Sequence, residues 1–436
     1  MCALWYTEAS FRFPLVCPMS DPIRLLHFAD IHVGMENYGR FDAETGFSSR
    51  VRDFLRRMDE MIAYAAEHQV DLTIFAGDAF KTRQPNPTYQ REFAHRVREL
   101  SQLAPLVLLV GNHDMPPTQL KASSVEIYDT LAVPNVIVAD EYKLHIIETR
   151  GGKVAVGAAP YPIRSRILTD DKRTAGLTIA EIDLLLQKEL SRILDALAEE
   201  AGELDMPRVL TGHFTVSGAV VGSERGIMLG RDVQVLPSSI ADPRWDYVAL
   251  GHIHKYQNLT EKRAGLPPVV YSGSMERIDF GEEGDPKGFC WVDLNRDGTR
   301  YRFIPLAARP FITLEMDLRT SAEPTAEVVD LIGAHDLREA VVRLLLRMTP
   351  EVEARFNEGI IRDVLRRAQV SHVAAIRKEI DQPARARLGD SPEGLTDMEL
   401  LERFFAAKQI DESRRAVLIE HAEQLIVSGK EVMNDE

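Results

Sequence analysis

Five short motifs in this chain of 436 residues each place metal-binding side chains directly after an apolar run. In chain order they are Asp30-Ile31-His32, Gly77-Asp78, Gly111-Asn112-His113-Asp114, Gly212-His213 and Gly251-His252-Ile253-His254. Apolar runs such as Leu72–Ala76 and Leu106–Val110 fit strands buried on both faces, so a motif begins where a central strand ends. Because open α/β sheets bind ligands beyond the carboxyl ends of their strands, we expect the motifs to meet at one sheet edge.

The types of side chain in these motifs indicate which metals the site accepts. Taken as ligands, two of the aspartates, the asparagine and three or four of the histidines offer oxygen and imidazole nitrogen without thiolate, which suits manganese, iron or zinc. These ligands are too many for one ion, so we expect two ions about 3.5 to 4 Å apart that share a ligand. Asp78, a lone carboxylate after a glycine, is the natural shared ligand. Because such ion pairs hold the attacking and leaving oxygens of a phosphoryl displacement, the pattern predicts phosphoester hydrolysis.

The prediction rests on the ordered set of motifs and on no single one of them. A lone Gly-Asp or Gly-His pair is more often part of a turn than of a functional site. Histidines outside the motifs are interpreted as ordinary surface or core residues, and they are His27, His68, His95, His145, His335, His372 and His421.

The order D-x-H, GD, GNHD, GH and GHxH resembles the calcineurin-type metallophosphoesterase superfamily. Longer segments resemble one branch of that superfamily, the SbcD-type DNA repair nucleases. These segments are TGHFTVSGAVVGSERG at 211–226, YVALGHIHK at 247–255 and YSGSMERIDFGE at 271–282. The similarity extends from about Ile23 to about Ile304 and is weaker beyond it.

The resemblance implies a role for each motif residue. The first metal ion would be held by Asp30, His32 and His254, and the second by Asn112, His213 and His252, with Asp78 as the bridge. His113 would be the catalytic residue that stabilises the charged transition state or protonates the leaving oxygen, and a bridging water would be the nucleophile. The expected cofactors are two divalent metal ions, with Mn²⁺ as the expected ion.

One position departs from the superfamily pattern. Three residues after Asp78 the chain has Lys81, where many relatives have Asp or His. The departure leaves open how His113 is oriented and how the scissile nucleotide is held. Asp114 would either orient His113 or cap the turn, and the sequence favours neither role.

The periodicity of apolar residues predicts an α/β fold. Residues 48–67 and 179–201 have helical spacing, and shorter strands return at 269–272, 288–294 and 299–304. We therefore expect two packed mixed β-sheets flanked by helices, which is also the fold of the superfamily. A small α+β capping domain and a C-terminal helix-loop-helix would follow. The predicted segments are an N-terminal extension at 1–18, a nuclease domain at 19–308, a capping domain at 309–388 and a docking segment at 389–436.

The amino-acid composition is typical of a globular protein with an ordinary hydrophobic core. Its net charge does not predict a general affinity for polyanions. The chain is 45% hydrophobic and 27% charged, and its formal net charge of -15 argues against a general nucleic-acid binder. A basic stretch from Arg362 to Arg387 is read equally well as a local DNA-binding patch or as a solvated helical face. The three cysteines predict neither a disulfide framework nor a cysteine metal site, and we expect no membrane span or signal peptide.

Three functions fit these features to different degrees. The favoured one is a metal-dependent DNA nuclease that cuts double-strand ends or hairpins with an SbcC-like ATPase partner, in DNA repair and recombination. A phosphatase or cyclic-nucleotide phosphodiesterase has less use for about 125 residues after the catalytic domain. A scaffold with a decayed site conflicts with the complete ligand set. The resemblance also implies DNA as substrate and a cytoplasmic, nucleoid-associated location. It further implies a homodimer formed through helices at about 89–100 and 123–131. The apolar residues of these helices fit ordinary core equally well, and they are Val97, Leu100, Val125 and Leu131.

The two ends of the sequence lead to separate predictions. Residues 1–18 have an unusual composition, and Met19 stands directly before the first strand, so we expect an extension that is disordered or absent. At 396–427, two apolar stripes flank a polar turn and are too small to bury both faces alone. The two helices that carry these stripes either fold back on their parent domain or dock the ATPase partner. The preceding linker at 389–394, which contains Gly and Pro, favours docking.

Overall fold

The computed structural model describes residues 22–43, 46–115, 121–168, 176–222, 233–381, 396–408, 410–412 and 414–422. They form two compact units. The first contains the described chain up to Thr313 together with 337–343 and 369–374, and the second contains 314–336, 344–368 and the described residues from Ala375 onward. All five motifs belong to the first unit. The predicted N-terminal extension and the linker at 389–394 lie outside the described residues.

The first sheet has the strand order β16-β15-β1-β4-β5-β6. Its strands are β1 (Ile23–Phe28), β4 (Leu72–Phe75), β5 (Leu106–Leu109), β6 (Val136–Ala139), β15 (Gly288–Leu294) and β16 (Arg300–Pro305). The strands β1, β4, β5 and β6 are parallel, whereas β15 and β16 join antiparallel. Every residue of β4 and β5 is buried, as their apolar sequences require.

The second sheet has the strand order β13-β14-β12-β9-β8-β7. Its strands are β7 (Lys143–Thr149), β8 (Gly152–Ala159), β9 (Arg208–His213), β12 (Tyr247–Gly251), β13 (Gln257–Asn258) and β14 (Val269–Tyr271). Its four central strands are parallel, and β7 and β13 close the two edges in antiparallel pairing.

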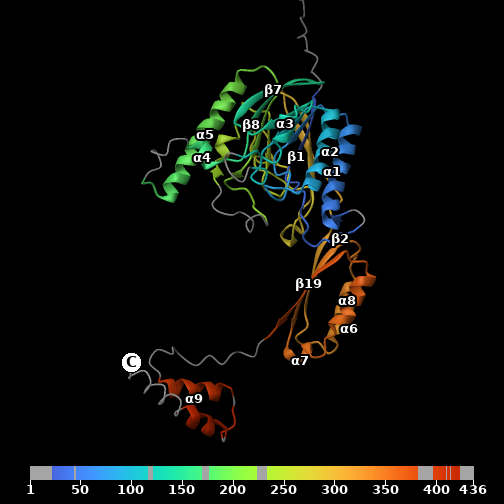
Figure 1. Ribbon diagram of the computed structural model, residues 1–436, viewed down its shortest axis with the longest axis vertical. Helices are drawn as coiled ribbons and strands as arrows, with labels where there is room; N and C mark the ends of the chain where they lie inside the picture. Colours follow the sequence, from blue (N-terminus) through green and yellow to red (C-terminus); the bar gives the residue numbers. More distant parts are fainter. Residues whose placement is uncertain are drawn as a thin grey trace, which may run out of the picture. The chain divides into compact units, whose positions relative to one another are not determined.

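The two sheets pack face to face and carry helices on their outer faces. Leu25 and Ile74 of the first sheet share one buried core with Val156 and Ala249 of the second. The helices α1 (Ser49–Glu67) and α2 (Pro87–Leu103) lie beside the first sheet, and α5 (Ile179–Gly202) covers the second (Figure 1). The predicted α/β architecture of two mixed sheets flanked by helices is therefore confirmed.

Capping residues explain where the predicted helices begin. The predicted helix at 48–67 begins at Ser49, because the Ser48 side chain is the N-cap and accepts a hydrogen bond from the Arg50 backbone N–H. The helix predicted at 179–201 begins at Ile179, after a capping box formed by Thr178 and Glu181.

The segments expected to form a homodimer have less free apolar surface than their sequences suggest. On α2, Val97 and Leu100 are buried in the core of the first unit, and Val125 is buried there as well. The second segment contains only one short helix, α3 (Ile127–Thr130). Ile127 and Leu131 of this segment are exposed. Of the side chains considered for both roles, only Leu131 is free for an interface.

Short elements complete the first unit. They are β2 (Phe41–Asp42), β3 (Phe47–Ser48), α4 (Arg164–Ile167), β10 (Thr215–Val216), β11 (Gln234–Val235), η3 (Pro237–Ser239) and η4 (Phe280–Glu282).

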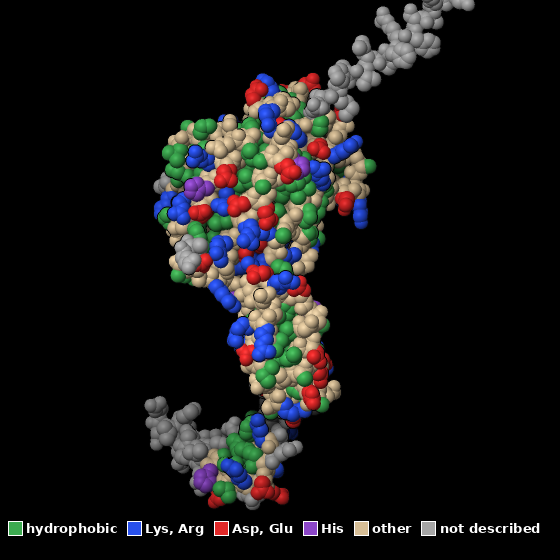
Figure 2. All heavy atoms as spheres, turned by 90° about the vertical axis from the view of Figure 1, so that its right-hand side faces the viewer, with side chains coloured by type: hydrophobic (Ala, Val, Ile, Leu, Met, Phe, Trp, Pro, Cys, Tyr) green, Lys and Arg blue, Asp and Glu red, His purple; other side chains and the backbone are tan. Residues whose placement is uncertain are grey.

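Figure 2 shows one face on which basic and acidic side chains are interspersed, so this face does not carry an electrostatic potential of one sign.

The later part of the chain has the mixed α+β character that its sequence predicts. A three-stranded sheet of order β17-β18-β19 is formed by β17 (Phe311–Asp317), β18 (Val341–Met348) and β19 (His372–Ile380). The helices are α6 (Pro324–Gly333), α7 (Pro350–Glu353), α8 (Glu358–Arg367) and α9 (Asp397–Ala407). The helices α6 and α8 bury Ile332 and Leu365.

Three basic residues of the stretch in the second unit are neutralised by acidic neighbours. Arg362 pairs with Glu358 at 2.7 Å, and Arg366 pairs with Asp363 at 2.8 Å. Lys378 pairs with Glu353 at 2.9 Å. These local pairs match a solvated helical face, whereas Arg385 and Arg387 lie outside the described residues.

The C-terminal residues form the first of the two predicted helices, α9, and a second helical segment at 414–422. Phe404 on α9 is 46% exposed, and Val417 on the second segment is 53% exposed. Leu425 and Ile426 lie outside the described residues. No helix in the described part of the chain combines the length and apolar composition that crossing a bilayer requires.

Candidate metal centre

The five motifs meet at the carboxyl ends of the central strands of both sheets. The strands β1, β4 and β5 lead into the first three motifs, and β9 and β12 lead into the last two. Ligand atoms of Asp30, His32 and His254 lie within 4.8 Å of one another. Those of Asp78, His213 and His252 form a second such group, and Asn112 Oδ1 lies 3.0 Å from a ring nitrogen of both His213 and His252. The seven side chains predicted as metal ligands are thus brought together.

Backbone hydrogen bonds hold the loops after β1 and β4 side by side. The Asp30 N–H donates to Gly77 O at 3.0 Å, and the Ile31 N–H donates to Asp78 O at 3.0 Å. Asp30, Asp78 and His32 have positive φ angles of 53°, 64° and 50°. Such conformations cost about 1–3 kcal/mol each, and these loop contacts stabilise them.

Asp114 fixes the loops that carry two of the predicted ligands. Its buried carboxylate accepts hydrogen bonds from the backbone N–H groups of Asp78 at 2.7 Å, Ala79 at 2.9 Å and Gly111 at 3.1 Å. Burial, together with the nearby charge of Asp78, raises the pKa of Asp114 to about 6. Of the two roles left open for Asp114, the structure shows the cap.

His113 is oriented by the backbone of residue 81. Its Nδ1–H donates to the carbonyl oxygen of Lys81 at 2.8 Å, and its backbone N–H donates to Asp78 Oδ1 at 2.8 Å. A carbonyl group is present whichever side chain occupies position 81. The lysine at this position therefore leaves the orientation of His113 intact and changes only the side chain beside it.

Two histidines of the second sheet have their ring orientation set by a second partner. His213 Nδ1–H donates to Ala76 O at 2.6 Å, and His254 Nδ1–H donates to Glu282 Oε1 at 3.0 Å. In the neutral rings, Nε2 then carries a lone pair. His254 Nε2 faces His32 Nε2 at 3.0 Å, and His213 Nε2 faces Asp78 Oδ2 at 3.3 Å. Facing lone pairs of nitrogen and oxygen at these distances fit a bound cation.

The electrostatics of the cluster also favour positive charge. Burial acts to lower the pKa of His213, but the charge of Asp78 outweighs it and raises that pKa to about 9. Burial acts to raise the pKa of Asp78, but the nearby His213 and His113 hold it well below its usual range. A group of side chains that retains a proton this firmly suits a metal ion in the proton's place.

A cavity of about 250 Å³ opens over these side chains. Met35 and Ile278 form apolar parts of its wall, and Lys81 contributes a cation. His113 lines the same cavity, and its ring lies 4.9 Å from the ring of His32. A substrate in this cavity would contact the predicted ligands and the predicted catalytic histidine together.

Sequence reasoning missed three residues that support the centre. Glu282 and Lys287 lie behind His254, and the ring of Tyr161 lies 5.8 Å from that of His252. The only signal for Glu282 was its place at the end of a segment similar to the SbcD-type nucleases. Burial acts to raise the pKa of Glu282, but Lys287 and His254 hold it below its usual range.

The described histidines outside the motifs stay away from this cluster. His27 is fully buried between the sheets, where its Nδ1 accepts from Tyr247 Oη at 3.1 Å and its Nε2–H donates to Leu250 O at 3.2 Å. Burial lowers the pKa of His27 to about 3. It is a core histidine, as interpreted from the sequence.

Comparison with known proteins gives a family match and several relatives. The sequence model of the calcineurin-like phosphoesterase family matches residues 23–256. A protein of Escherichia coli K12, named as one of the subunits of the nuclease SbcCD, is 27% identical over 418 residues, which cover 90% of this chain and 95% of that protein. A Rhodobacter capsulatus protein of the same name is 30% identical over 352 residues, which cover 77% and 79%. A solved dimetal phosphatase from Danio rerio has a TM-score of 0.35 and 11% identity, over 65% of this chain and 99% of that one.

Proposed function

The chain belongs to the calcineurin-like phosphoesterase family and, within it, to the SbcD-type nucleases, and on this basis we propose that it hydrolyses DNA phosphodiester bonds with two divalent metal ions. One observation carries the two-ion proposal. Asp78 Oδ2 lies 3.3 Å from His213 Nε2 and 3.8 Å from His32 Nε2, so one carboxylate oxygen faces a histidine of each predicted ligand set. In this proposal Asp78 is the bridging ligand.

The proposed ligand sets follow from this arrangement. The first ion is held by Asp30, His32 and His254, and the second by Asn112, His213 and His252. Manganese is the proposed ion, and the oxygen and imidazole-nitrogen donors accept it as they accept iron or zinc. When bound, a pair of divalent ions lowers the pKa of a water molecule and stabilises charge on phosphoryl oxygens.

His113 is the proposed catalytic residue. Because its Nδ1–H is held by the Lys81 carbonyl group, Nε2 is the atom left to act on a substrate in the cavity. In the imidazolium form, which has a proton on both ring nitrogens, Nε2–H donates that proton to the leaving oxygen or stabilises the charged phosphoryl group.

The side chain of Lys81 is the proposed contact for a substrate phosphate. It lines the cavity, is half-buried, and forms no ion pair with any residue of the described chain. The phosphodiester backbone is a polyanion and would supply the missing negative charge. Met35 and Ile278 supply the apolar wall against which a sugar or base packs.

A comparison of two substrates tests the proposed activity. Linear duplex DNA and a chromogenic phosphodiester are each incubated with the purified chain and Mn²⁺, with a chelator as the control. We expect cleavage of the DNA that the chelator abolishes. Hydrolysis of the chromogenic diester alone would instead support the small-substrate phosphodiesterase.

The proposed cellular setting is DNA repair in the cytoplasm, at the nucleoid, as a homodimer with an SbcC-like ATPase. The relatives are named as subunits of a nuclease, and exposed apolar side chains on α9 and the following helical segment offer a docking surface.

Truncation after Gly389 should leave Mn²⁺-dependent cleavage of short DNA near normal and abolish co-purification with the ATPase. Wild-type capture of the ATPase by the truncated chain would contradict docking through this segment.

A further inference from the structure

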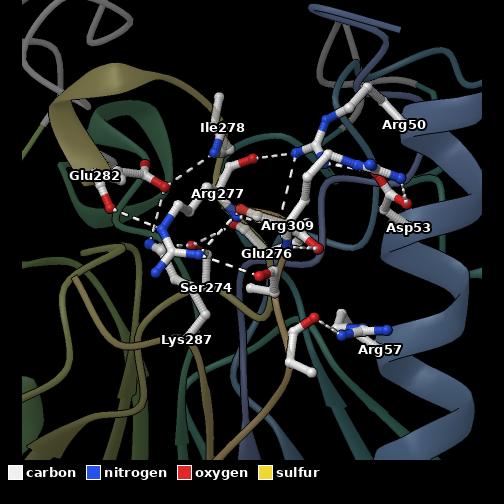
Figure 3. Close-up of polar contacts among 12 residues, drawn as sticks. Arg50, Asp53, Arg57, Ser274, Glu276, Arg277, Ile278, Glu282, Lys287 and Arg309 are labelled. Carbon is white, nitrogen blue, oxygen red and sulfur yellow. Dashed lines mark hydrogen bonds and ion pairs between the residues drawn. The ribbon is translucent and has the colours of Figure 1, made fainter. Parts of the chain in front are cut away.

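A buried pair of opposite charges lies directly behind His254. Glu282, at the end of η4, is 0% exposed, and Lys287 is 2% exposed. Lys287 Nζ lies 2.8 Å from Glu282 Oε2 (Figure 3). Desolvating two charges costs several kcal/mol per ion, and well-packed apolar residues often stabilise such a position equally well. The pair therefore calls for an explanation other than stability.

Both charged groups contact His254, at opposite ends of that residue. Glu282 Oε1 accepts from the His254 ring at 3.0 Å, while Lys287 Nζ donates to the His254 carbonyl oxygen at 3.1 Å. Glu282 Oε2 also accepts from the Ile278 backbone N–H at 3.0 Å, and Lys287 Nζ donates to Ser274 Oγ at 2.8 Å. The carboxylate is thus held from several directions, and its remaining oxygen is directed at the imidazole.

The loop that carries Glu282 is held independently of His254. The Arg277 side chain donates to the carbonyl oxygens of Asp285 and Arg309, each at 3.0 Å (Figure 3). The carboxylate of Glu276, also 0% exposed, accepts from the backbone N–H groups of Arg277 at 2.9 Å and Arg309 at 3.0 Å. Arg309 is in turn paired with Asp53 on α1 at 2.6 Å. This network fixes the loop, so Glu282 is positioned before any metal ion binds.

We propose that Glu282, held by Lys287, is a positioning residue that fixes the tautomer and direction of His254 and so raises the affinity of the centre for its first metal ion. The inference rests on the proposed metal centre. Its physical basis is that a carboxylate behind a ligand imidazole keeps the proton on Nδ1 and makes Nε2 a stronger donor to the metal.

Metal binding by the full chain tests this proposal without any DNA. Metal-stripped protein is titrated with Mn²⁺ in a calorimeter, and with Co²⁺ while its visible absorption is recorded. The variants are Glu282→Gln and the double variant Glu282→Gln/Lys287→Met, which removes the carboxylate without leaving a buried unpaired lysine. Glu276→Gln is the matched control, because the glutamine keeps the side-chain oxygen that accepts from the Arg277 and Arg309 N–H groups, and so keeps the loop in place. It neutralises a buried glutamate that contacts none of the proposed ligands.

We expect both Glu282 variants to lose about 10- to 100-fold in affinity for one of the two ions, the usual range for such outer partners. The Co²⁺ spectrum should change with it, whereas Glu276→Gln should bind like the parent. Melting temperatures recorded with chelator show whether each variant is folded. Parent-like affinity in the folded double variant would overturn the proposal, as would an equal loss in Glu276→Gln. A parent chain that bound no metal would also remove the proposed function, so the two failures are distinguishable.

Discussion

The two sheets contribute to the metal centre in different ways. Loops of the first sheet supply all the proposed oxygen ligands, Asp30, Asp78 and Asn112, whereas the second sheet supplies only histidines to the proposed ligand sets. Backbone N–H groups hold the carboxylates in place, since Asp30 accepts from His252 N–H at 3.0 Å and Asp78 accepts from His113 N–H at 2.8 Å. Both carboxylates are thus held by backbone N–H groups, which come from the second sheet for Asp30 and from the first sheet for Asp78.

Two histidine rings of the second sheet, by contrast, are held by oxygen acceptors. The ring of His213 is held by Ala76 O, which is 137 residues away at the end of β4. The ring of His254 is held by Glu282, which is 28 residues away. A carboxylate offers several lone pairs in many directions, whereas an imidazole must have its second nitrogen occupied before the first one is directed at a metal. Histidine ligands therefore require support from outside their own motif.

The largest effect is expected at Asp78, the one ligand that faces a histidine from each sheet. Asp78→Ala should remove the link between the two ligand sets and lower Mn²⁺-dependent DNA cleavage by about 10³-fold or more. Metal content measured by mass spectrometry should fall below two ions per chain. Full metal occupancy with normal cleavage would contradict the shared-ligand arrangement.

A smaller loss is expected at His113, which the first sheet positions but which holds no metal in the proposed centre. His113→Leu should lower turnover by about 10²-fold, the scale for losing an acid or electrostatic group, while the chain keeps both metal ions. Single-turnover cleavage and metal analysis of the same preparation check this. A His113→Leu chain depleted of metal would make His113 a ligand rather than a catalytic group.

A substitution of Lys81 tests the effect of its side chain while the backbone carbonyl group at this position stays unchanged. Lys81→Met keeps the carbonyl group that orients His113 and removes only the cation beside the cavity. We expect KM for duplex DNA to rise by about 10-fold, with kcat nearly unchanged and a weaker dependence on salt. Arg91→Met is the control, because Arg91 is exposed on α2 and pairs with Glu92. A selective fall in kcat would show that the lysine acts on the chemical step.

The smallest effect concerns His27, an imidazole buried between the same two sheets without a carboxylate beside it. Its pKa of about 3 lies below the unfolded value of 6.5, so between these pH values only the unfolded chain binds the proton. The stability that His27 contributes is complete above about pH 6.5 and falls toward pH 3, by at most about 1.4 kcal/mol per pH unit. His27→Gln should remove this slope in urea unfolding with chelator present. Parallel pH profiles for parent and variant would contradict it.

The contrast between His27 and His213 shows what the surroundings of a buried histidine decide. Both residues lie between the sheets, but the pKa of His213 is raised to about 9 because Asp78 faces it, whereas the pKa of His27 is lowered. In sequence each is one histidine at or near the end of an apolar run. Motif spacing assigned only His213 to the metal centre, and it does not reveal the direction of either pKa shift.

Much of the fold follows from local sequence. The helices α1 and α5 begin within one residue of their predicted starts, because capping side chains and apolar spacing are local properties. The helix predicted at 123–131 is only Ile127–Thr130, and Val97 and Leu100 are core residues. Apolar spacing predicts a buried face, and it does not tell whether a sheet of the same chain or a second copy covers that face.

The sequence by itself determined the two-sheet architecture and the seven side chains that meet at its edge, because a buried parallel strand must end in a loop at that edge. Tertiary structure alone decided what orients them. Asp114 caps two loops, the Lys81 carbonyl group holds His113, and Glu282 holds His254. The reason is that a hydrogen-bond partner for a side chain is chosen by proximity in space, and Glu282 and Ala76 come close to their histidines only after the sheets have packed.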